Sequence, residues 1–396
     1  MKQVKNRYGN VAAGGMDVHQ KFSQVTMRDS EAKVVCRERL DHPDRQRLRE
    51  RLSAWPRDVP IVMEASFGWA WLADLMREIG LSPQLSNCFK VEQMRKARGL
   101  AKTNRKDADL LSLLPSEKDG WWKVWMAPPE VRDRREWMRY RADLVQISTQ
   151  TQSRIHAIFH RHGVFHAFSD LFGAGGRKFL AQLCRDGRAP DVQLPDGALA
   201  ALRGQVRLLG HVRGQLAEVA RRLKAELARD PVAGRLDGIP GIGLILAHTL
   251  KAEIGQIGRF RNHRALASYS LLGPICDDTG EQDAQARPIG RHLGQRGNRT
   301  LKWAFIEAAH GAVKTGGRWR KMFDACTEGG QKNRNRGYIK VARELVTVVY
   351  VIWKKNVEYT DHPPGRPKAS RRGRMERFFS ARSGTGQPFV AMADAR

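Results

Sequence analysis

The chain has 396 residues, 41% of them hydrophobic, which allows two or three folded domains and excludes a largely disordered protein. Seventy lysines and arginines against 41 acids give a formal net charge of +29, which points to nucleic acid as the partner. Five cysteines without a CxxC pair argue against disulfide frameworks and zinc modules and fit a reducing cytoplasm. "MKQVKNRYGNVAAGG" has no long apolar segment, so we expect a cytoplasmic protein without a membrane anchor.

Residues 12–118 predict an α/β domain built on a mixed sheet. Three strand-like runs, "GGMDV", "FSQVTMRD" and "KVVCRERL", precede a polar helix and a further buried strand, "VPIVMEAS", which ends in an acid. "WAWLADLMREIG" then predicts a helix closed by Gly80. Successive strands followed by an alternation of strand and helix are typical of a mixed sheet.

Acids stand at the ends of two of these strands and on a later helix. Asp17 ends the first strand and Glu64 ends "VPIVME". In "AKTNRKDADLL", Thr103 or Asn104 can cap a helix on which Asn104 and Asp107 share a face. Oxygen ligands from separate elements can converge on one or two Mg²⁺ ions, with Mn²⁺ as the alternative ion. This order predicts an RNase H-like acidic centre, whereas any one acid alone would indicate only a solvated helix charge.

Basic residues surround the helix acids. Lys102, Arg105 and Lys106 are interpreted as phosphate contacts that flank the metal site. His19 follows Asp17 by two residues and could position a phosphate or a water, although a structural or exposed histidine is the more ordinary interpretation.

Residues 130–230 predict a helical coiled-coil region. Two long stretches carry apolar side chains at spacings of three, four or seven: Trp137, Tyr140, Leu144, Ile147, Thr151 and Ile158, then Leu199, Leu202, Val206, Leu209, Leu216, Leu223 and Leu227. We expect an antiparallel helical pair that serves as a spacer or in self-association. Ordinary core packing within one chain is the alternative.

Residues 231–355 form a third, mainly helical unit. "IPGIGLILAHTL" has the form of a helix-hairpin-helix, in which Gly241 and Gly243 would let backbone N–H groups approach a DNA phosphate; a plain tight turn is the alternative. Further on, Asp278, Thr279 and Gly280 form a small loop that spacing alone would leave as a turn. A clean helix is expected from about residue 299, and the Arg-rich tail, 360–396, should be disordered when free.

Six segments, taken in order, resemble the DEDD transposases of the IS-one-ten insertion-sequence family over most of residues 12–355. "GMDVHQK", "VMEASFGWAWL" and "AKTNRKDA" are similar to its RuvC-like N-terminal half. "IPGIGLILAHTL", "YSLLGPICDDTGE" and "RHLGQRGNRTLKWAFIEAA" are similar to its C-terminal transposase half. Single motifs are loose, but six in this order are specific.

The resemblance implies a recombinase that moves its own element. In this family a magnesium-binding acidic centre works with a serine of the C-terminal domain, which attacks a DNA phosphodiester and forms a covalent intermediate. It also implies an element-encoded guide RNA, and dimers that pair into tetramers and join active-site halves across subunits.

Carried over residue by residue, Asp17, Glu64 and Asp107 take the first, second and fourth acidic positions, and Asn104 stands where the family has an aspartate. An amide oxygen can still ligate magnesium without charge, and Asp109 is the alternative ligand. The family serine aligns with Thr279, which becomes the expected nucleophile, with Ser270 a distant second. Candidates for stabilising the pentavalent phosphate are Arg287, Arg291 and Arg299.

The leading hypothesis is therefore a magnesium-dependent DNA transposase that acts through a threonine hydroxyl and is guided by RNA. One alternative is a RuvC-like structure-specific nuclease, which would need Asp17 and Glu64 but not Thr279. The other is a catalytically decayed transposase copy that only binds nucleic acid, with Asn104 as the disabling change.

Overall fold

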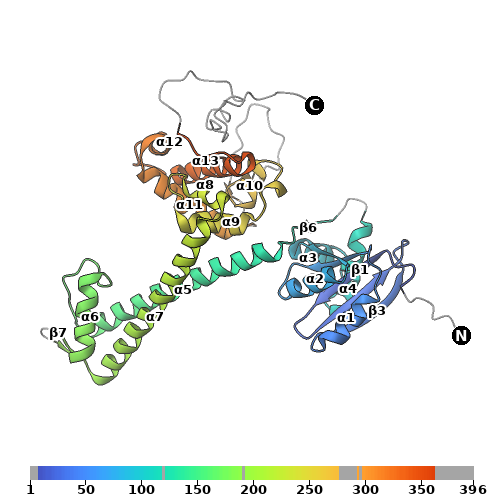
Figure 1. Cartoon of the computed structure of the whole chain (residues 1–396), viewed down its shortest axis with the longest axis horizontal. Helices are drawn as coiled ribbons and strands as arrows, with labels where there is room; N and C mark the ends of the chain where they lie inside the picture. The colour runs from blue at the N-terminus through green and yellow to red at the C-terminus, as the bar shows by residue number, and fades with distance from the viewer. Residues whose placement is uncertain (1–7, 118–120, 190–191, 276–291, 294–296, 362–396) are drawn as a thin grey trace, which may run out of the picture. The chain divides into compact units, whose positions relative to one another are not determined.

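The computed structural model describes residues 8–117, 121–189, 192–275, 292–293 and 297–361. The chain divides into two compact units, Met1–Ala127 and Pro128–Arg396, and each is described by itself (Figure 1). Among the described helices, none combines the length and the apolar character needed to cross a lipid bilayer.

Unit 1 is built from strands and helices that alternate along the chain. Its strands are β1 (Ala13–Val18), β2 (Phe22–Arg28), β3 (Val34–Asp41), β4 (Pro60–Glu64), β5 (Ser82–Ser86) and β6 (Lys123–Val124). Its helices are α1 (Arg45–Ser53), α2 (Trp69–Glu78), α3 (Cys88–Ala97), α4 (Asn104–Leu113) and the short 3-10 turn η1 (Leu114–Ser116). The strands predicted near residues 14, 22, 33 and 59 are all present, whereas β5, β6 and α3 had not been anticipated.

The six strands form one mixed sheet in the order β3-β2-β1-β4-β5-β6. β1, β2 and β3 pair antiparallel, β1, β4 and β5 pair parallel, and β6 returns antiparallel at the edge. This confirms the expected mixed α/β sheet and fits an RNase H-like fold. The parallel junction of β1 and β4 brings the ends of both strands to one edge.

Helices cover both faces of the sheet because its central strands bury side chains on each side (Figure 1). Met16 and Met63 pack with α1 and α2 in one apolar cluster. Val62 points to the opposite face and packs with Leu110 and Leu111 of α4. Side chains alternate between the two faces along a strand, so neighbouring residues in β1 and β4 serve different layers.

Helix α4 lies directly on β1 at Gly15. A Cβ atom at Gly15 would overlap the backbone oxygen of Ala108 and the backbone nitrogen of Ser112. Gly14, the preceding residue, faces the other layer, where a Cβ would meet only the tip of the Ile61 side chain, at 2.7 Å. The absence of a side chain at Gly15 therefore sets the distance between helix and strand.

Unit 2 is mainly helical. Its helices are α5 (Pro129–Arg161), α6 (Ala174–Asp186), α7 (Asp196–Leu227), α8 (Pro231–Asp237), α9 (Leu244–Ile254), η2 (Ile257–Arg259), α10 (His263–Tyr269), α11 (Arg299–Lys314), α12 (Gly317–Thr327) and α13 (Arg334–Lys355). Two short strand pairs complete it: β7 (Arg188–Ala189) with β8 (Val192–Gln193), and β9 (Pro274–Ile275) with β10 (His292–Leu293). The helix expected from about residue 299 is α11.

The two long helices, α5 and α7, form the predicted antiparallel pair (Figure 1). Ile155 near the end of α5 packs with Leu202 near the start of α7, and Met138 near the start of α5 packs with Leu223 near the end of α7. Much of the periodic apolar pattern is thus core within one chain. Two of its positions, Tyr140 and Ile147, were expected in that stripe but are 41% and 39% exposed. Helices α5 and α7 also contact α9, so residues 130–230 and 231–355 lie in one compact unit. The division of these two ranges into separate domains stays a prediction.

The core of the C-terminal helices is built by α9, α11 and α13, with buried side chains such as Leu250, Phe305 and Val349. The turn between α8 and α9 rests on α11. Gly241 in that turn has φ +85°, and a Cβ there would overlap backbone atoms of Ala308 and Ala312. Close packing inside unit 2 therefore already requires glycine at 241, independently of any DNA contact.

The helix–strand contact at Gly15 generates the first prediction. Gly15→Ala should destabilise the protein by about 3 kcal/mol or more, or prevent soluble expression, because the methyl group meets rigid backbone. The matched control, Gly14→Ala, should change stability by no more than about 1 kcal/mol, because a flexible side-chain tip can move aside. Thermal or urea unfolding measures both, and equal behaviour of the two variants would contradict the packing described.

Candidate active site

Asp17 and Glu64 stand beside each other at the same end of two parallel strands. Met16 of β1 and Met63 of β4 are register partners, so the next residue of each strand is Asp17 and Glu64 respectively. Side chains two apart on a strand share a face, so Asp17 shares the face on which Gly15 contacts α4. Both carboxylates therefore project into the layer occupied by α4.

Helix α4 brings Asp107 to these strand ends. Thr103 is its N-cap, and the Thr103 side chain accepts a first-turn backbone N–H at 3.2 Å. Asp107 lies in the first turn and is half-buried, one residue before the contact of Ala108 with Gly15. Asn104 begins the helix and is exposed on the same face as Asp107. The capping predicted from the sequence is confirmed, with Thr103 rather than Asn104 as the cap.

The three carboxylates interact electrostatically. Burial, followed by the negative charges of Asp17 and Asp107, raises the pKa of Glu64 to about 7. Burial and the charge of Asp17 also raise the pKa of Asp107, and burial raises that of Asp17. Lys102 opposes the shift at all three. The charge of Asp17 thus acts on both Glu64 and Asp107, in agreement with the neighbouring positions that the strand register and the first turn of α4 give these residues.

His19 contacts this group directly. Its Nε2 lies 3.0 Å from Oδ2 of Asp17, and its ring packs against Phe22 with centroids 4.7 Å apart. The contact holds one oxygen of Asp17 in a fixed direction. The two-residue spacing of Asp17 and His19 was a signal for this contact, because residues two apart on a strand lie on the same face. An ordinary exposed histidine was nevertheless the more common interpretation of that spacing.

The donors of the group have the chemistry that a divalent cation requires. Three half-buried carboxylates, of which Asp17 raises the pKa of the other two, would be relieved of repulsion by a 2+ ion, and carboxylate oxygen is the ligand that Mg²⁺ prefers. Within the described parts of the chain, no three His, Cys, Asp or Glu side chains are already drawn together as a metal-binding cluster. Asp17, Glu64 and Asp107 therefore fit a metal by ligand type and by their neighbouring positions, and ion binding would require their side chains to converge.

Asp109 faces away from this group and is wrong as the alternative ligand. Its carboxylate accepts hydrogen bonds from Thr26 Oγ1 at 2.8 Å and from Arg37 Nε and Nη2 at 2.8 and 3.1 Å. Burial tends to raise the pKa of Asp109, but the bonds from Arg37 and Thr26 outweigh burial and lower it. Two residues along a helix turn a side chain by about 200°, so Asp107 and Asp109 point to opposite sides of α4.

Most of the predicted phosphate contacts that the structure describes are exposed, whereas Gly241 is half-buried against α11. Lys102, Arg105 and Lys106 surround the first turn of α4, and Gly243 is exposed at the start of α9. Arg299 is the exposed first residue of α11. Their roles in DNA binding stay predictions.

Several of the predicted nucleophile-loop residues lie outside the described part of the chain: Asp278, Thr279, Gly280, Arg287 and Arg291. The second candidate nucleophile, Ser270, is described and is fully buried. A buried hydroxyl cannot reach a DNA phosphate, so the structure argues against Ser270.

Sequence reasoning also passed over Arg95. This residue of α3 lowers the pKa of Asp107 by its positive charge, and its guanidinium is held by Glu92 at 2.7 and 2.9 Å. It adds a second cation, beside Lys102, to the surroundings of the acids. No motif in the chain pointed to Arg95, because α3 itself was not predicted.

Two family models match the chain. A model described as a transposase of the DEDD type, named for IS110, matches residues 14–163. A model described as the transposase IS116/IS110/IS902 family matches residues 233–324. Together they cover the strands that carry Asp17 and Glu64, helix α4, helices α9 to α11 and most of α12.

Individual relatives agree with these matches. An uncharacterized 44.8 kDa protein of insertion element IS116 from Streptomyces clavuligerus is 26% identical over 36% of this chain and 35% of its own length. The transposase for insertion sequence element IS1328 from Yersinia enterocolitica is 29% identical over 36% of this chain and 42% of its own. A probable family 20 transposase from Pseudomonas aeruginosa is 24% identical over 77% of this chain and 85% of its own. The chain thus spans about a third of the length of the first curated relatives it matches.

The raised pKa of Glu64 predicts a stability that depends on pH. Because the folded-state pKa, about 7, exceeds the ordinary value of 4.5, stability should fall as pH rises from about 4.5 to 7, and the ionised group then destabilises the fold. Glu64→Gln should therefore raise the thermal unfolding midpoint at pH 8, with EDTA present, by a few degrees, on the order of 2–4 °C.

Asp109→Asn is the matched control, because its lowered pKa has the opposite sign. The ionised Asp109 stabilises the fold above its ordinary pKa of 3.8, and this contribution is lost on acidification. The substitution should lower the midpoint at pH 8. If both variants shifted the midpoint in the same direction, the opposite electrostatic environments inferred for the two acids would be wrong.

Proposed function

This chain belongs to the IS110 family of transposases, and from this premise we propose that it is a DNA transposase that cleaves and rejoins strands with an acidic centre and a hydroxyl nucleophile. The observation that supports the proposal most directly is that Asp17 and Glu64, at the adjacent ends of β1 and β4, lie beside Asp107 in the first turn of α4. Three acids that share one location and repel one another are costly to the fold, and such a cost is typical of a functional site.

The acidic centre would hold Mg²⁺, with Mn²⁺ as the alternative ion. Asp17, Glu64 and Asp107 would supply charged oxygens, and Asn104 a neutral amide oxygen from the exposed start of α4. When bound, the ion would neutralise charge on the phosphate and orient it. His19 would keep one oxygen of Asp17 directed, since it binds Oδ2 at 3.0 Å.

The hydroxyl of Thr279 would act as the nucleophile. Its oxygen would attack phosphorus, a new P–O bond to threonine would form, and the bond to one DNA oxygen would break; that oxygen would leave as a hydroxyl after taking a proton. Attack by a hydroxyl of a second strand end would reverse these steps and restore Thr279. Positive side chains, for which Arg287, Arg291 and Arg299 are the candidates, would stabilise the pentavalent phosphate.

Charge favours the proposed partners. The net charge of +29 suits a long polyanion, and Lys102, Arg105 and Lys106 are exposed beside the acids as phosphate contacts would need to be. An element-encoded guide RNA and assembly into dimers or tetramers belong to the same proposal. The exposed apolar side chains of α5, Tyr140 and Ile147, are available to a second copy.

An excision assay with an element-bearing plasmid tests the chemistry. Asp17→Asn, Glu64→Gln and Asp107→Asn should each reduce excision by about 10³-fold or more, because a carboxylate of the site is removed. Glu78→Gln, at an exposed acid of the same unit that pairs with Arg49 at 2.8 Å, should leave excision unchanged. Wild-type excision by any of the three site variants would remove the proposed acidic centre.

Thr279→Ala separates the transposase from its rivals. It should abolish strand transfer together with the covalent protein–DNA adduct that denaturing gels detect. A RuvC-like nuclease would instead keep cleaving after this change. In a decayed copy the wild-type chain would be inactive, and Asn104→Asp would restore activity by returning a charged ligand.

RNA guidance has a test that needs no assumed substrate. The protein, expressed with its native flanking DNA and purified at moderate salt, should retain one discrete RNA that maps to the flank, identified by sequencing. A heterogeneous mixture of cellular RNA would instead indicate charge-driven binding alone, and it would count against the guided mechanism.

A further inference from the structure

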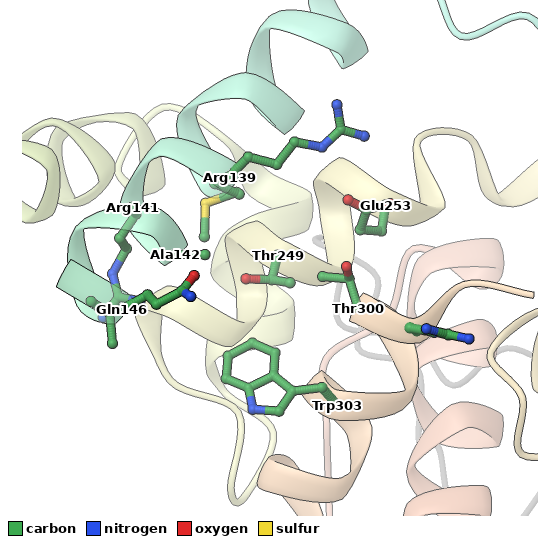
Figure 2. A pocket seen from close by; sticks show the side chains of 11 residues that line it. Arg139, Arg141, Ala142, Gln146, Thr249, Glu253, Thr300 and Trp303 are labelled. Atoms are coloured by element: carbon green, nitrogen blue, oxygen red, sulfur yellow. The ribbon is translucent and has the colours of Figure 1, made fainter. Parts of the chain in front are cut away.

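A cavity of about 490 Å³ lies within unit 2, between α5, α9 and α11 (Figure 2). Its apolar wall includes Met138 and Val145 of α5 and the indole of Trp303 of α11. Trp303 is 47% exposed, whereas Phe305, the other large aromatic side chain of α11, is fully buried. An indole that lies open beside a cavity of this volume presents a flat face to a ligand, and the volume falls within the range of small-molecule sites.

The rim of the cavity is positively charged. Arg139 and Arg141 line it from α5, and Arg299 lines it from α11. Arg141 has no carboxylate partner among the residues that the structure describes, and burial lowers its pKa. Arg139 pairs with Glu136 at 3.1 Å, but both side chains are well exposed, so the pair contributes little. An anion bound at this rim would stabilise the charged form of Arg141, which burial disfavours.

Hydrogen bonds hold the cavity floor rigid. The buried Glu253 accepts a hydrogen bond from Asn298 Nδ2 at 2.7 Å, and Asn298 Oδ1 accepts the backbone N–H of Leu301 at 2.9 Å. The start of α11 is thereby fixed to α9. Gln146 and Thr300 add polar side chains to the lining, of the kind that hydrogen-bond to a base edge (Figure 2).

We propose that this cavity binds an unpaired nucleotide of single-stranded DNA, with its base stacked on Trp303 and its phosphates held by Arg139 and Arg141. A flat aromatic face in a cavity with cations on its rim is the combination by which proteins bind unpaired bases and their backbone. A base inside a duplex is stacked and cannot enter such a cavity. The choice of DNA as the occupant rests on the proposed function, whereas the stacking chemistry does not.

Binding of short fluorescent oligonucleotides to the full-length protein, measured by anisotropy in EDTA, tests the proposal. The probes are a thymidine strand, an abasic strand of equal length, the matching duplex, and a uridine strand of RNA. Trp303→Ala should weaken binding of the thymidine strand by about 5- to 100-fold, because base stacking is lost. The affinities for the abasic strand and the duplex should stay within about twofold of wild type.

Three further variants sharpen the comparison. Trp303→Phe should restore most of the affinity, because a smaller aromatic ring still stacks. Arg141→Met should weaken the thymidine and abasic strands alike and lower the salt dependence of binding by about one phosphate contact. Phe165→Ala is the matched control, since Phe165 is an exposed aromatic of unit 2 outside the cavity, and it should bind as wild type does.

Two outcomes would overturn the proposal. The first is equal weakening of all four probes by Trp303→Ala, or no weakening of any. The second is weaker binding of the uridine strand with unchanged binding of the thymidine strand, which would indicate that the cavity binds RNA. Thermal unfolding of Trp303→Ala should match wild type because the indole is half exposed. No probe requires metal or cleavage, so a failure here is independent of the excision result.

Discussion

The contact of helix α4 with strand β1 at Gly15 is the constraint on which the candidate active site depends. Helix and strand approach until a Cβ at Gly15 would overlap the helix backbone. At that distance the first turn of α4 reaches the strand ends, and Asp107 becomes a close neighbour of Asp17 and Glu64. A wider separation would leave Asp107 on an ordinary solvated helix. The absence of a side chain at Gly15 thus allows Asp107 to lie close to Asp17 and Glu64.

Helix α4 carries one acid whose charged form is destabilised by its surroundings and another whose charged form is stabilised. Asp107 adds to a set of carboxylates that repel one another, whereas Asp109, on the opposite side of the helix, is held by Arg37 and Thr26. Arg28 strengthens this attachment through a bond of 2.8 Å from its Nε to Ser112 Oγ. Strands β2 and β3 therefore anchor α4 from the side away from the site. Such an arrangement lets repulsion persist in the absence of a cation without displacing the helix.

The elements with a regular pattern could be predicted from the sequence, and those defined by their neighbours could not. The strands that carry Asp17 and Glu64 and the cap at Thr103 followed from local signals, and so did the pair formed by α5 and α7. Helix α3 and strand β5 ("SPQLS") were missed because neither has a clear apolar period, and Arg95 was missed with α3. The direction of Asp109 and the exposure of Trp303 depend on which surfaces meet in three dimensions, which no spacing along the chain records.

Asn298 makes three hydrogen bonds, one through its backbone N–H and two through its side chain. These bonds limit the residues that homologous chains can carry at position 298. Its backbone N–H binds the Tyr269 carbonyl at 2.8 Å, its Oδ1 caps α11, and its Nδ2 binds the buried Glu253. Aspartate and serine are the usual substitutes at a helix cap. Here aspartate would set two carboxylates against each other, and serine is too short to serve both partners. An evolutionary exchange at 298 would therefore need a compensating change at 253, so the two positions are expected to vary together among homologous chains.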